Sequence, residues 1–433
     1  MSEQNPSSAN GTTNSAGPSR RIFLKTSALA AAAMQLSSTG SLHAAGKDEI
    51  KVGVVGCGGR GSGATRDSLE ADPGVKILAM ADVFADRLKS NLDSQKTRFP
   101  DRVDVPAERQ FIGFDGYKKL LECDLDYVIF ATPPYFRAEQ VEAAVQAGKH
   151  VFMEKPIGVD PVACKRIMAA GDLAAEKKLT VVTGTQRRHE DCYIEMIKRV
   201  RDGALGEILG GQVYWNQGQL WYKTKQEGWN DLEWMLKDWV SWRWLSGDHY
   251  VEQHVHNIDV MNWFKDGHPV RAVGSGGRAH RVTGDQYDYF AVDYEFADGS
   301  HFASYARQVN GCANAVEERV FGTKGQSYST SNRAEIKGAN EWKFRRAKKD
   351  FVSPYVQEHI DLIASIREGK GLNEARRIAE STLTAIMGRE ACYTGRAITW
   401  DEMMKSDMKL GPSETITWDI AAPEVKVPVA GTA

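Results

Sequence analysis

The chain has 433 residues, and its 55 Lys and Arg against 57 Asp and Glu give a formal net charge of −2. Because nucleic-acid-binding proteins usually carry a marked basic excess, this balance argues against nucleic acid as a partner. Hydrophobic residues make up 42%, which excludes a disordered or collagenous chain, and the length suggests two or three domains. The six cysteines form no CxxC pair, so we expect free thiols rather than a zinc site or a disulfide framework.

Residues 1–45 are predicted to be a leader. The first 18 residues are rich in Ser, Asn, Gly and Thr and have little to bury, so we expect disorder. Residues 19–25 read SRRIFLK, and a short apolar run over 26–36 precedes a small-residue cleavage region at 43–45. This is the pattern of a twin-arginine export signal, although a chance Arg-Arg before an Ala-rich helix is an alternative. The run is too short for the roughly 20 residues that span a bilayer, so we expect an exported, periplasmic or otherwise extracytoplasmic protein without a stable membrane span.

A phosphate-binding turn is expected directly after the first strand. From Ile50 a short β-branched run leads into G-x-G-x-x-G at Gly56, Gly58 and Gly61, and a helical stretch follows over 64–70. The first glycine permits a tight turn, the second lets the backbone approach a pyrophosphate, and the third allows close packing of helix on strand. The diphosphate would then lie at the helix N-terminus.

The second strand, predicted over 75–81, ends at Asp82, 21 residues beyond Gly61. An acidic residue there accepts hydrogen bonds from the adenosine ribose hydroxyls and repels a 2′-phosphate, so Asp82 favours NAD over NADP. Arg87 lies nearby in the chain, so NADP remains an alternative cofactor.

Strands and helices continue to alternate up to residue 183. Helices are expected over 85–98, near 117–122, over 137–147 and over 161–178, and strands over 126–132, 150–153 and 179–183. The alternation predicts an N-terminal Rossmann domain, a doubly wound parallel sheet, over residues 46–186. Ligands bind at the carboxyl ends of such strands, which is where Thr132-Pro133-Pro134 and Glu154-Lys155-Pro156 occur.

The second half reads as a further α/β domain over residues 187–412. Alternating runs at 212–215, 270–282, 289–296 and 301–309 predict strands, and amphipathic helices are expected over 356–368 and 374–393. The tail, 413–433, is rich in Pro, Ala and Val, and we expect it to wrap the surface.

These features together resemble the glucose–fructose oxidoreductase and inositol dehydrogenase family, often called Gfo/Idh/MocA. The residues that carry the resemblance are the glycine turn 56–61, Asp82, Ala131-Thr132-Pro133-Pro134, Glu154-Lys155-Pro156, Glu252-x-x-x-His256-x-x-Asp259 and the Phe-Gly-Thr-Lys-Gly turn at 321–325. The resemblance implies a C-terminal α/β domain with a mostly antiparallel open sheet, which covers the nicotinamide end and often forms oligomer contacts. We therefore expect a homo-oligomer, a dimer or a tetramer.

The motifs and the resemblance together predict a set of cofactor-binding residues. They are Gly56, Gly58, Gly59, Arg60, Gly61, Asp82, Thr132, Pro133, Glu154 and Lys155. In the family the lysine of Glu-Lys-Pro also hydrogen-bonds the reacting oxygen, so Lys155 is expected to stabilise a developing alkoxide. His256 looks like the general base, because an imidazole can titrate near neutrality. Glu252, expected on the same helix face, would orient or charge-couple His256 or bind a substrate hydroxyl.

The expected substrate contacts are Arg188, His254 and Asp259. The family usually has Asp where this chain has Glu252, and Gly where it has His254, so this part of the site departs from the pattern. A solvated basic turn is the alternative for Arg188, and a core histidine is the alternative for His254. These residues with His249 could in principle hold a metal ion. The family generally needs none for hydride transfer, so no metal is expected.

Eight of the eleven tryptophans fall between Trp215 and Trp263. Indole faces can stack on the C–H faces of sugars, so a carbohydrate platform is one interpretation, and a packed insertion or a subunit interface is another.

The expected function is an NAD(P)-dependent oxidoreductase that transfers hydride between a nicotinamide and a secondary hydroxyl of a sugar, glycoside or polyol. Free dinucleotide is scarce outside the cytoplasm, so an exported enzyme should hold its NAD tightly and regenerate it within its own cycle. The alternative is a redox-neutral, NAD-dependent glycosidase that acts by transient oxidation, elimination and hydration. A catalytically silent dinucleotide or sugar sensor would need neither Lys155 nor His256.

Overall fold

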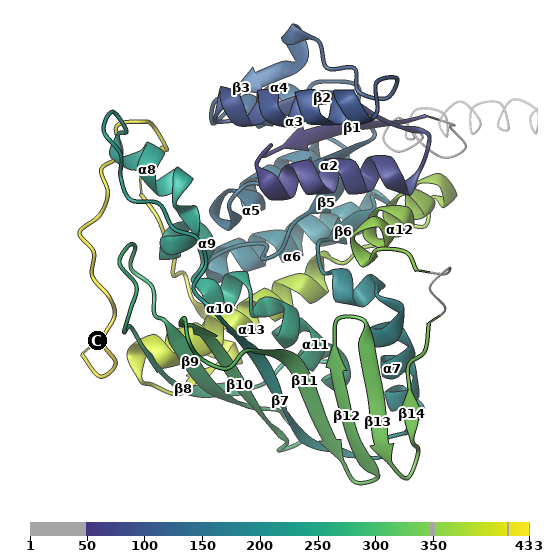
Figure 1. The fold of residues 1–433 in the computed structure, drawn as a ribbon, viewed down its shortest axis with the longest axis vertical. Coiled ribbons are helices and arrows are strands. Elements are labelled where there is room, and N and C mark those ends of the chain that lie inside the picture. The colour runs from purple at the N-terminus through teal and green to yellow at the C-terminus, as the bar shows by residue number, and fades with distance from the viewer. Residues whose placement is uncertain (1–48, 347–350, 414, 433) are drawn as a thin grey trace, which may run out of the picture. The chain divides into compact units, whose positions relative to one another are not determined.

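The structure is a computed structural model that describes residues 49–346, 351–413 and 415–432 (Figure 1). The predicted leader of residues 1–45, with its twin-arginine pattern, lies outside the described residues. Within the described ranges no helix is both long and apolar enough to cross a bilayer. All six cysteines are described and are free thiols, which confirms that prediction.

Six parallel strands form the first sheet. They are β1 (Ile50–Val55), β2 (Val75–Asp82), β3 (Gln110–Ile112), β4 (Tyr127–Phe130), β5 (His150–Met153) and β6 (Val181–Thr183). Their order is β3-β2-β1-β4-β5-β6, and every pairing is parallel. The order reverses between β1 and β4, and ligands bind beyond the carboxyl ends of the strands at such a point. The predicted doubly wound parallel sheet is confirmed.

Helices cover both faces of this sheet (Figure 1). From the N-terminal part of the chain they are α2 (Gly59–Ala71), α3 (Ala85–Arg98), α4 (Gly116–Leu121), α5 (Pro134–Gln146) and α6 (Pro161–Glu176). Helix α2 begins five residues earlier than the sequence suggested, so the last motif glycine, Gly61, lies buried in its first turn. The lack of a side chain at this position lets the helix pack closely on the end of β1.

Helix α12 (Pro354–Glu368) comes from near the C-terminus but packs against α2 of the first sheet. Its Leu362 and Ile366 are buried in the same apolar cluster as Ile50 and Phe152. The prediction that this helix belongs to the second domain, within 187–412, is therefore wrong. An amphipathic pattern shows that one face is buried, but it does not say against which sheet.

The second sheet has nine strands. They are β7 (Ile208–Gln217), β8 (Arg271–Gly277), β9 (Tyr289–Glu295), β10 (His301–Gln308), β11 (Ala315–Gly322), β12 (Gly325–Thr330), β13 (Arg333–Gly338), β14 (Trp342–Lys343) and β15 (Ile398–Thr399). Their order is β14-β13-β12-β11-β7-β10-β9-β8-β15. The pairing of β7 with β10 is parallel and the other described pairings are antiparallel. This confirms the mostly antiparallel open sheet. Helices α11 (Val255–Lys265) and α13 (Ala375–Thr394) pack on it.

Two irregular segments complete the fold. The first, residues 218–246, follows β7 and contains α8 (Asp231–Lys237), the 3₁₀ turn η3 (Trp239–Ser241) and α9 (Arg243–Ser246); we call it the insertion. The second, residues 406–432, follows α14 (Trp400–Lys405) and forms no helix or strand in its described residues. It begins seven residues before the predicted tail of 413–433, and from here on we use the name tail for residues 406–432. Both share an apolar cluster with Phe84 of the first domain. The tail therefore does lie over the surface of both domains, and it also contributes to a core.

Candidate active site

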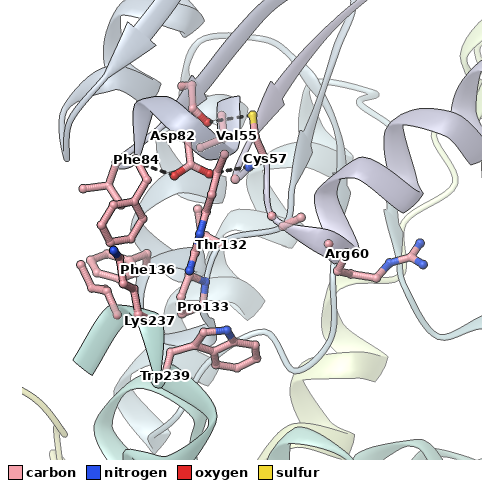
Figure 2. Close-up of a pocket in the computed structure, with 18 of the residues that line it drawn as sticks. Val55, Cys57, Arg60, Asp82, Phe84, Thr132, Pro133, Phe136, Lys237 and Trp239 are labelled. Carbon is pink, nitrogen blue, oxygen red and sulfur yellow. Dashed lines mark hydrogen bonds between the residues drawn. The ribbon is translucent and has the colours of Figure 1, made fainter. Parts of the chain in front are cut away.

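A cavity of about 560 Å³ opens at the carboxyl ends of β1, β2 and β4 (Figure 2). On the side of the first sheet it is lined by seven members of the predicted cofactor set: Gly56, Gly58, Gly59, Arg60, Asp82, Thr132 and Pro133. The insertion lines the other side with Trp221, Lys223, Leu236, Lys237 and Trp239. The remaining predicted residues, Gly61, Glu154 and Lys155, lie outside this lining.

The glycine turn is shaped by close approach of the backbone. Gly56 has a φ of +90°, and a Cβ built there would lie 2.7 Å from the carbonyl carbon of Ala131. A Cβ on Gly61 would lie 1.8 Å from the carbonyl oxygen of Gly56, so both positions require glycine. Gly58 and Gly59 face open space instead, with no atom within 4 Å of an added Cβ. This open cradle at the start of α2 fits the pyrophosphate of a dinucleotide.

Asp82 holds the turn from the side of β2. Its carboxylate accepts the backbone N–H of Cys57 at 2.6 Å and that of Phe84 at 2.8 Å (Figure 2). Burial raises the pKa of Asp82, and the two hydrogen bonds oppose the rise. Each carboxylate oxygen can accept a second hydrogen bond, so the group fits ribose hydroxyls. Arg87 also lines the cavity, so the preference for NAD over NADP stays a prediction.

Arg60 and Glu154, both predicted to bind the cofactor, bind each other. Arg60 Nε lies 2.5 Å from Glu154 Oε1, and Figure 2 shows the Arg60 side chain pointing away from Asp82. Glu154 is buried, so its carboxylate is used inside the protein. The ion pair fastens the start of α2 to the end of β5, directly beside Lys155. Glu154 therefore has a positioning role, because the folded chain supplies a partner that the motif did not reveal, whereas Arg60 both binds Glu154 and lines the cavity.

Arg137 is a buried residue of this site that the sequence motifs do not indicate. Its guanidinium donates to the carbonyl oxygen of Thr132 at 2.6 Å and also to that of Pro156. It thus ties the loop after β4 to the loop after β5, and these loops carry Pro133 and Lys155. Because both acceptors are backbone atoms, the contact leaves no signal in the pattern of side chains along the chain.

Lys155 is fixed by two hydrogen bonds to a single residue of the second domain. Its Nζ donates to the Glu252 carboxylate at 2.9 Å and to the Glu252 backbone carbonyl at 2.6 Å. Both side chains are largely buried, with exposed fractions of 13% and 15%. Glu252 is the last residue of α10 (His249–Glu252), so this contact joins the two domains.

Glu252 and His256 lie on two successive helices rather than on one continuous helix, so the single helical face that was predicted for them is interrupted. Helix α10 ends at Glu252, and α11 begins at Val255. The His256 ring instead stacks on Trp215, with centres 5.6 Å apart and planes 20° apart. Burial, and then the nearby charge of Lys155, hold the pKa of His256 well below its ordinary value of 6.5. The imidazole is therefore neutral at neutral pH and able to accept a proton.

Arg188 and Asp259, both predicted to touch substrate, form a bidentate ion pair with each other. The Nε–Oδ2 distance is 2.7 Å and the second contact is 2.9 Å. Asp259 is 1% exposed and also accepts a hydrogen bond from Ser381 at 2.8 Å. The geometry therefore gives Asp259 a structural role. Of this pair, only Arg188 is partly accessible, with 13% of its side chain exposed.

His254 is fully buried, with Nε2 2.7 Å from Ser304 Oγ, and burial lowers its pKa to about 3. It is therefore a core histidine rather than a substrate contact. His189, which follows Arg188, is also buried: its Nδ1 lies 2.6 Å from Asp361 Oδ2. Burial alone would lower the pKa of His189, but the Glu374 carboxylate and the Asp361 hydrogen bond raise it to about 10. Both histidines serve the interior rather than a substrate surface.

The structure also tests two further interpretations of the sequence, a metal site and a platform of tryptophan rings. In the part of the chain that the structure describes, no group of three or more His, Cys, Asp or Glu is arranged to hold a metal ion. Part of the tryptophan group is packed inside the insertion: Trp242 is fully buried and lies edge-on to Trp234 at 5.1 Å. Trp215 on β7 and Trp263 on α11 lie outside the insertion, and Trp221 is 49% exposed. Trp221 and Trp239 line the cofactor cavity.

The site combines a dinucleotide cleft on a parallel sheet with a lysine held at the contact to a second domain, which has an open sheet. This combination defines the class of nicotinamide-dependent oxidoreductases. Family models agree with this class. The model described as "Oxidoreductase family, NAD-binding Rossmann fold" matches residues 50–185, and the "GFO/IDH/MocA C-terminal domain" matches residues 193–328. The chain belongs to the Gfo/Idh/MocA family of oxidoreductases.

Curated relatives are distant and match in part. Inositol 2-dehydrogenase of Salmonella typhimurium (strain LT2) is 25% identical over 217 residues, which are 49% of this chain and 54% of the relative. A glycosyl hydrolase family 109 protein of Shewanella pealeana is 30% identical over 214 residues, 45% of each chain. The chain thus spans about half the length of the curated relatives it matches.

Solved structures share the fold. Scyllo-inositol dehydrogenase from Lactobacillus casei, solved with NAD(H) and scyllo-inositol, has a TM-score of 0.60 at 22% identity and covers 81% of this chain and 99% of its own. Levoglucosan dehydrogenase, solved with NADH and levoglucosan, has a TM-score of 0.63 at 15% identity with the same coverage.

Proposed function

We propose that this protein transfers hydride between a tightly held NAD and a secondary hydroxyl of a sugar, glycoside or polyol. One observation carries the proposal: Glu252 fixes the Lys155 ammonium where the two domains meet beside the cofactor cleft. The charge of Lys155 helps to keep the His256 imidazole neutral. The relatives named as inositol dehydrogenases support a polyol or sugar as substrate.

Oxidation of a secondary alcohol requires a hydride acceptor and a base. A nicotinamide bound in the cleft would supply the acceptor. Lys155 would donate a hydrogen bond to the reacting oxygen and stabilise the negative charge that develops there. His256, being neutral, would take the hydroxyl proton. Glu252 would keep Lys155 in place rather than act on His256.

We further propose export by the twin-arginine route, on the basis of residues 19–45, and assembly as a dimer or tetramer. Outside the cytoplasm the protein would work with the NAD that it carried out, so each turnover must end with the cofactor restored. Asp82 at the end of β2 supports NAD rather than NADP.

The first experiment is to purify the exported protein without added cofactor, denature it, and quantify the released dinucleotide by mass spectrometry and absorbance. We expect about one NAD(H) per subunit. The protein is then given polyols and sugars deuterated at their carbinol carbons. We expect deuterium to appear in the bound cofactor. Absence of transfer from every substrate, in protein that holds NAD, would contradict an oxidoreductase.

A redox-neutral glycosidase is the second candidate, and the similarity to a glycosyl hydrolase family 109 protein favours it. In this reaction the hydride leaves a ring carbon, the neighbouring C–H loses its proton, and the aglycone departs as an alcohol. Water then adds to the double bond, and the same hydride returns to the ring. No external oxidant is consumed.

Aryl glycosides incubated in deuterated water without added NAD separate the two candidates. Cleavage with deuterium incorporated at the carbon beside the transiently oxidised one would establish the glycosidase. Cleavage without deuterium, or no cleavage, would leave the oxidoreductase as the only supported reaction.

A further inference from the structure

The outer wall of the cofactor cavity does not belong to the dinucleotide-binding domain. It is formed by the insertion, whose Leu236, Lys237 and Trp239 line the cavity opposite the glycine turn. Figure 2 shows Lys237 and Trp239 on the side of the cavity away from Asp82. A bound dinucleotide would therefore be enclosed between two parts of the chain that are far apart in sequence.

This wall is anchored by an apolar cluster. Phe84, two residues after the end of β2, packs with Leu236 and Trp242 of the insertion and Ile420 of the tail. Trp242 is completely buried. Moving the wall away from the first domain would expose these side chains to water, which opposes opening.

The tail braces the cluster from outside the cavity. The Trp418 ring lies 5.9 Å from the Phe84 ring and 5.1 Å from the Phe114 ring, and both phenylalanines line the cavity. The backbone N–H of Ala422 donates to Asp231 at the start of α8 at 2.9 Å. Figure 1 shows the tail running alongside α8. The tail thus contacts both walls of the cavity without lining it.

The charge of the cavity suits an anionic ligand. Its lining has four basic residues, Arg60, Arg87, Lys223 and Lys237, against two acidic ones, Asp82 and Asp86. Lys237 Nζ lies 5.4 Å from the centre of the Phe84 ring and 2.8 Å from Glu233 Oε1, so its charge lies beside an aromatic face and is partly balanced by Glu233. Asp82, which fits ribose hydroxyls, identifies this part as the adenosine side of the dinucleotide.

We infer that the insertion and the tail form a cover over the adenosine half of NAD(H) and make its dissociation slow. The inference rests on the proposed function, because it takes NAD(H) as the ligand. The tail lies outside both ranges matched by the family models. Release of the cofactor is then coupled to separation of the insertion from Phe84 and Phe114, and its rate depends on Trp418.

The test is isotope exchange of the bound cofactor in the full-length protein. NAD(H)-loaded protein is mixed with an excess of heavy-isotope NAD, desalted at intervals, and analysed by mass spectrometry for the unlabelled cofactor that remains. Trp418→Ala removes the brace without altering the cavity lining, and Trp239→Ala removes part of the wall. Trp418→Phe keeps an aromatic ring. Trp342→Ala, on β14 of the second sheet, is the matched control.

We expect Trp418→Ala and Trp239→Ala to exchange cofactor at least about tenfold faster than the wild type, in line with loss of aromatic contacts. Trp418→Phe and Trp342→Ala should exchange at close to the wild-type rate. Equal exchange rates in Trp418→Ala and the wild type would overturn the cover, as would complete exchange in the wild type before the first time point. A wild type that takes up no NAD(H) would instead overturn the proposed function itself.

Discussion

The Lys155 ammonium donates to both the carboxylate and the backbone carbonyl of Glu252, at 2.9 and 2.6 Å. The two residues are 97 positions apart and belong to different domains. A lysine held in this way loses little conformational freedom when a substrate oxygen reaches it, so its hydrogen bond to that oxygen is pre-organised. The geometry of the reaction centre therefore depends on how the two domains pack.

Lys155→Ala should reduce kcat by about a thousandfold, the scale of a lost proton-transfer or charge-stabilising group. Lys155 lies outside the cavity lining, so the variant should still retain NAD(H). Single-turnover deuteride transfer, together with the cofactor content, measures both effects. Lys89→Ala, on the exposed surface of α3, serves as the control and should behave as the wild type.

Glu252→Gln should lower kcat by about tenfold and leave KM little changed. The backbone carbonyl still accepts from Lys155, but the charged acceptor is lost, and a hydrogen bond to a charged group contributes roughly 1.5–3 kcal/mol. Glu252→Asp, which shortens the side chain and keeps the charge, should retain more activity than Glu252→Gln. Steady-state kinetics that rank Gln at or above Asp would argue against the positioning role. Glu368→Gln, in an exposed pair with Lys370, is the control.

The pH profile should report the neutral state of His256. Because its pKa lies well below 6.5, the ring stays unprotonated as the pH falls from about 8 to about 6, and kcat/KM should stay level over that range. Activity should fall only at lower pH, as the ring gains its proton. Trp215→Ala would open the stacked face to water, which raises the pKa of His256 toward its ordinary value. The acid limb should then move upward, and an unmoved limb would show that another group sets it.

Two glycines of one turn should respond oppositely to alanine. In Gly58→Ala the added methyl group meets no atom of the protein, so the apo-protein should melt at the wild-type temperature. Its affinity for NAD should nevertheless fall by about tenfold, because the methyl group occupies the cradle. Gly61→Ala meets the carbonyl oxygen of Gly56 at 1.8 Å and should lose about 3 kcal/mol of stability. Thermal melting and NAD titration distinguish the two, and similar behaviour of both variants would contradict the assignment.

His189 should stabilise the protein in a pH-dependent way. Its pKa of about 10 lies above its ordinary 6.5, so the stabilisation is complete below pH 6.5 and is lost as the pH rises toward 10. His189→Gln should therefore be less stable than the wild type by about 2 kcal/mol near pH 6, and the gap should shrink with rising pH. Denaturant unfolding over this range measures it. A gap that does not vary with pH would exclude the charged state, and His301→Gln, in an exposed pair with Asp293, is the control.

Much of the fold was predictable because its signals are local. The glycine spacing, the position of Asp82 and the strand–helix alternation each lie within a short window of sequence, and all reappear in the first sheet. The placement of α12 was not predictable in this way. Its amphipathic pattern shows that one face is buried but not against which sheet, and only the assembled core shows that Leu362 packs with the first one.

The site divides along the same line. By itself the sequence determined the family, the dinucleotide fold and the candidate residues Lys155, Glu252 and His256, because motifs are read along the chain. Only the tertiary structure decided which groups meet. Glu252 bonds to Lys155, 97 residues away in the chain, because domain packing brings the two side chains within 2.9 Å, and a break between α10 and α11 separates the helix of Glu252 from that of His256.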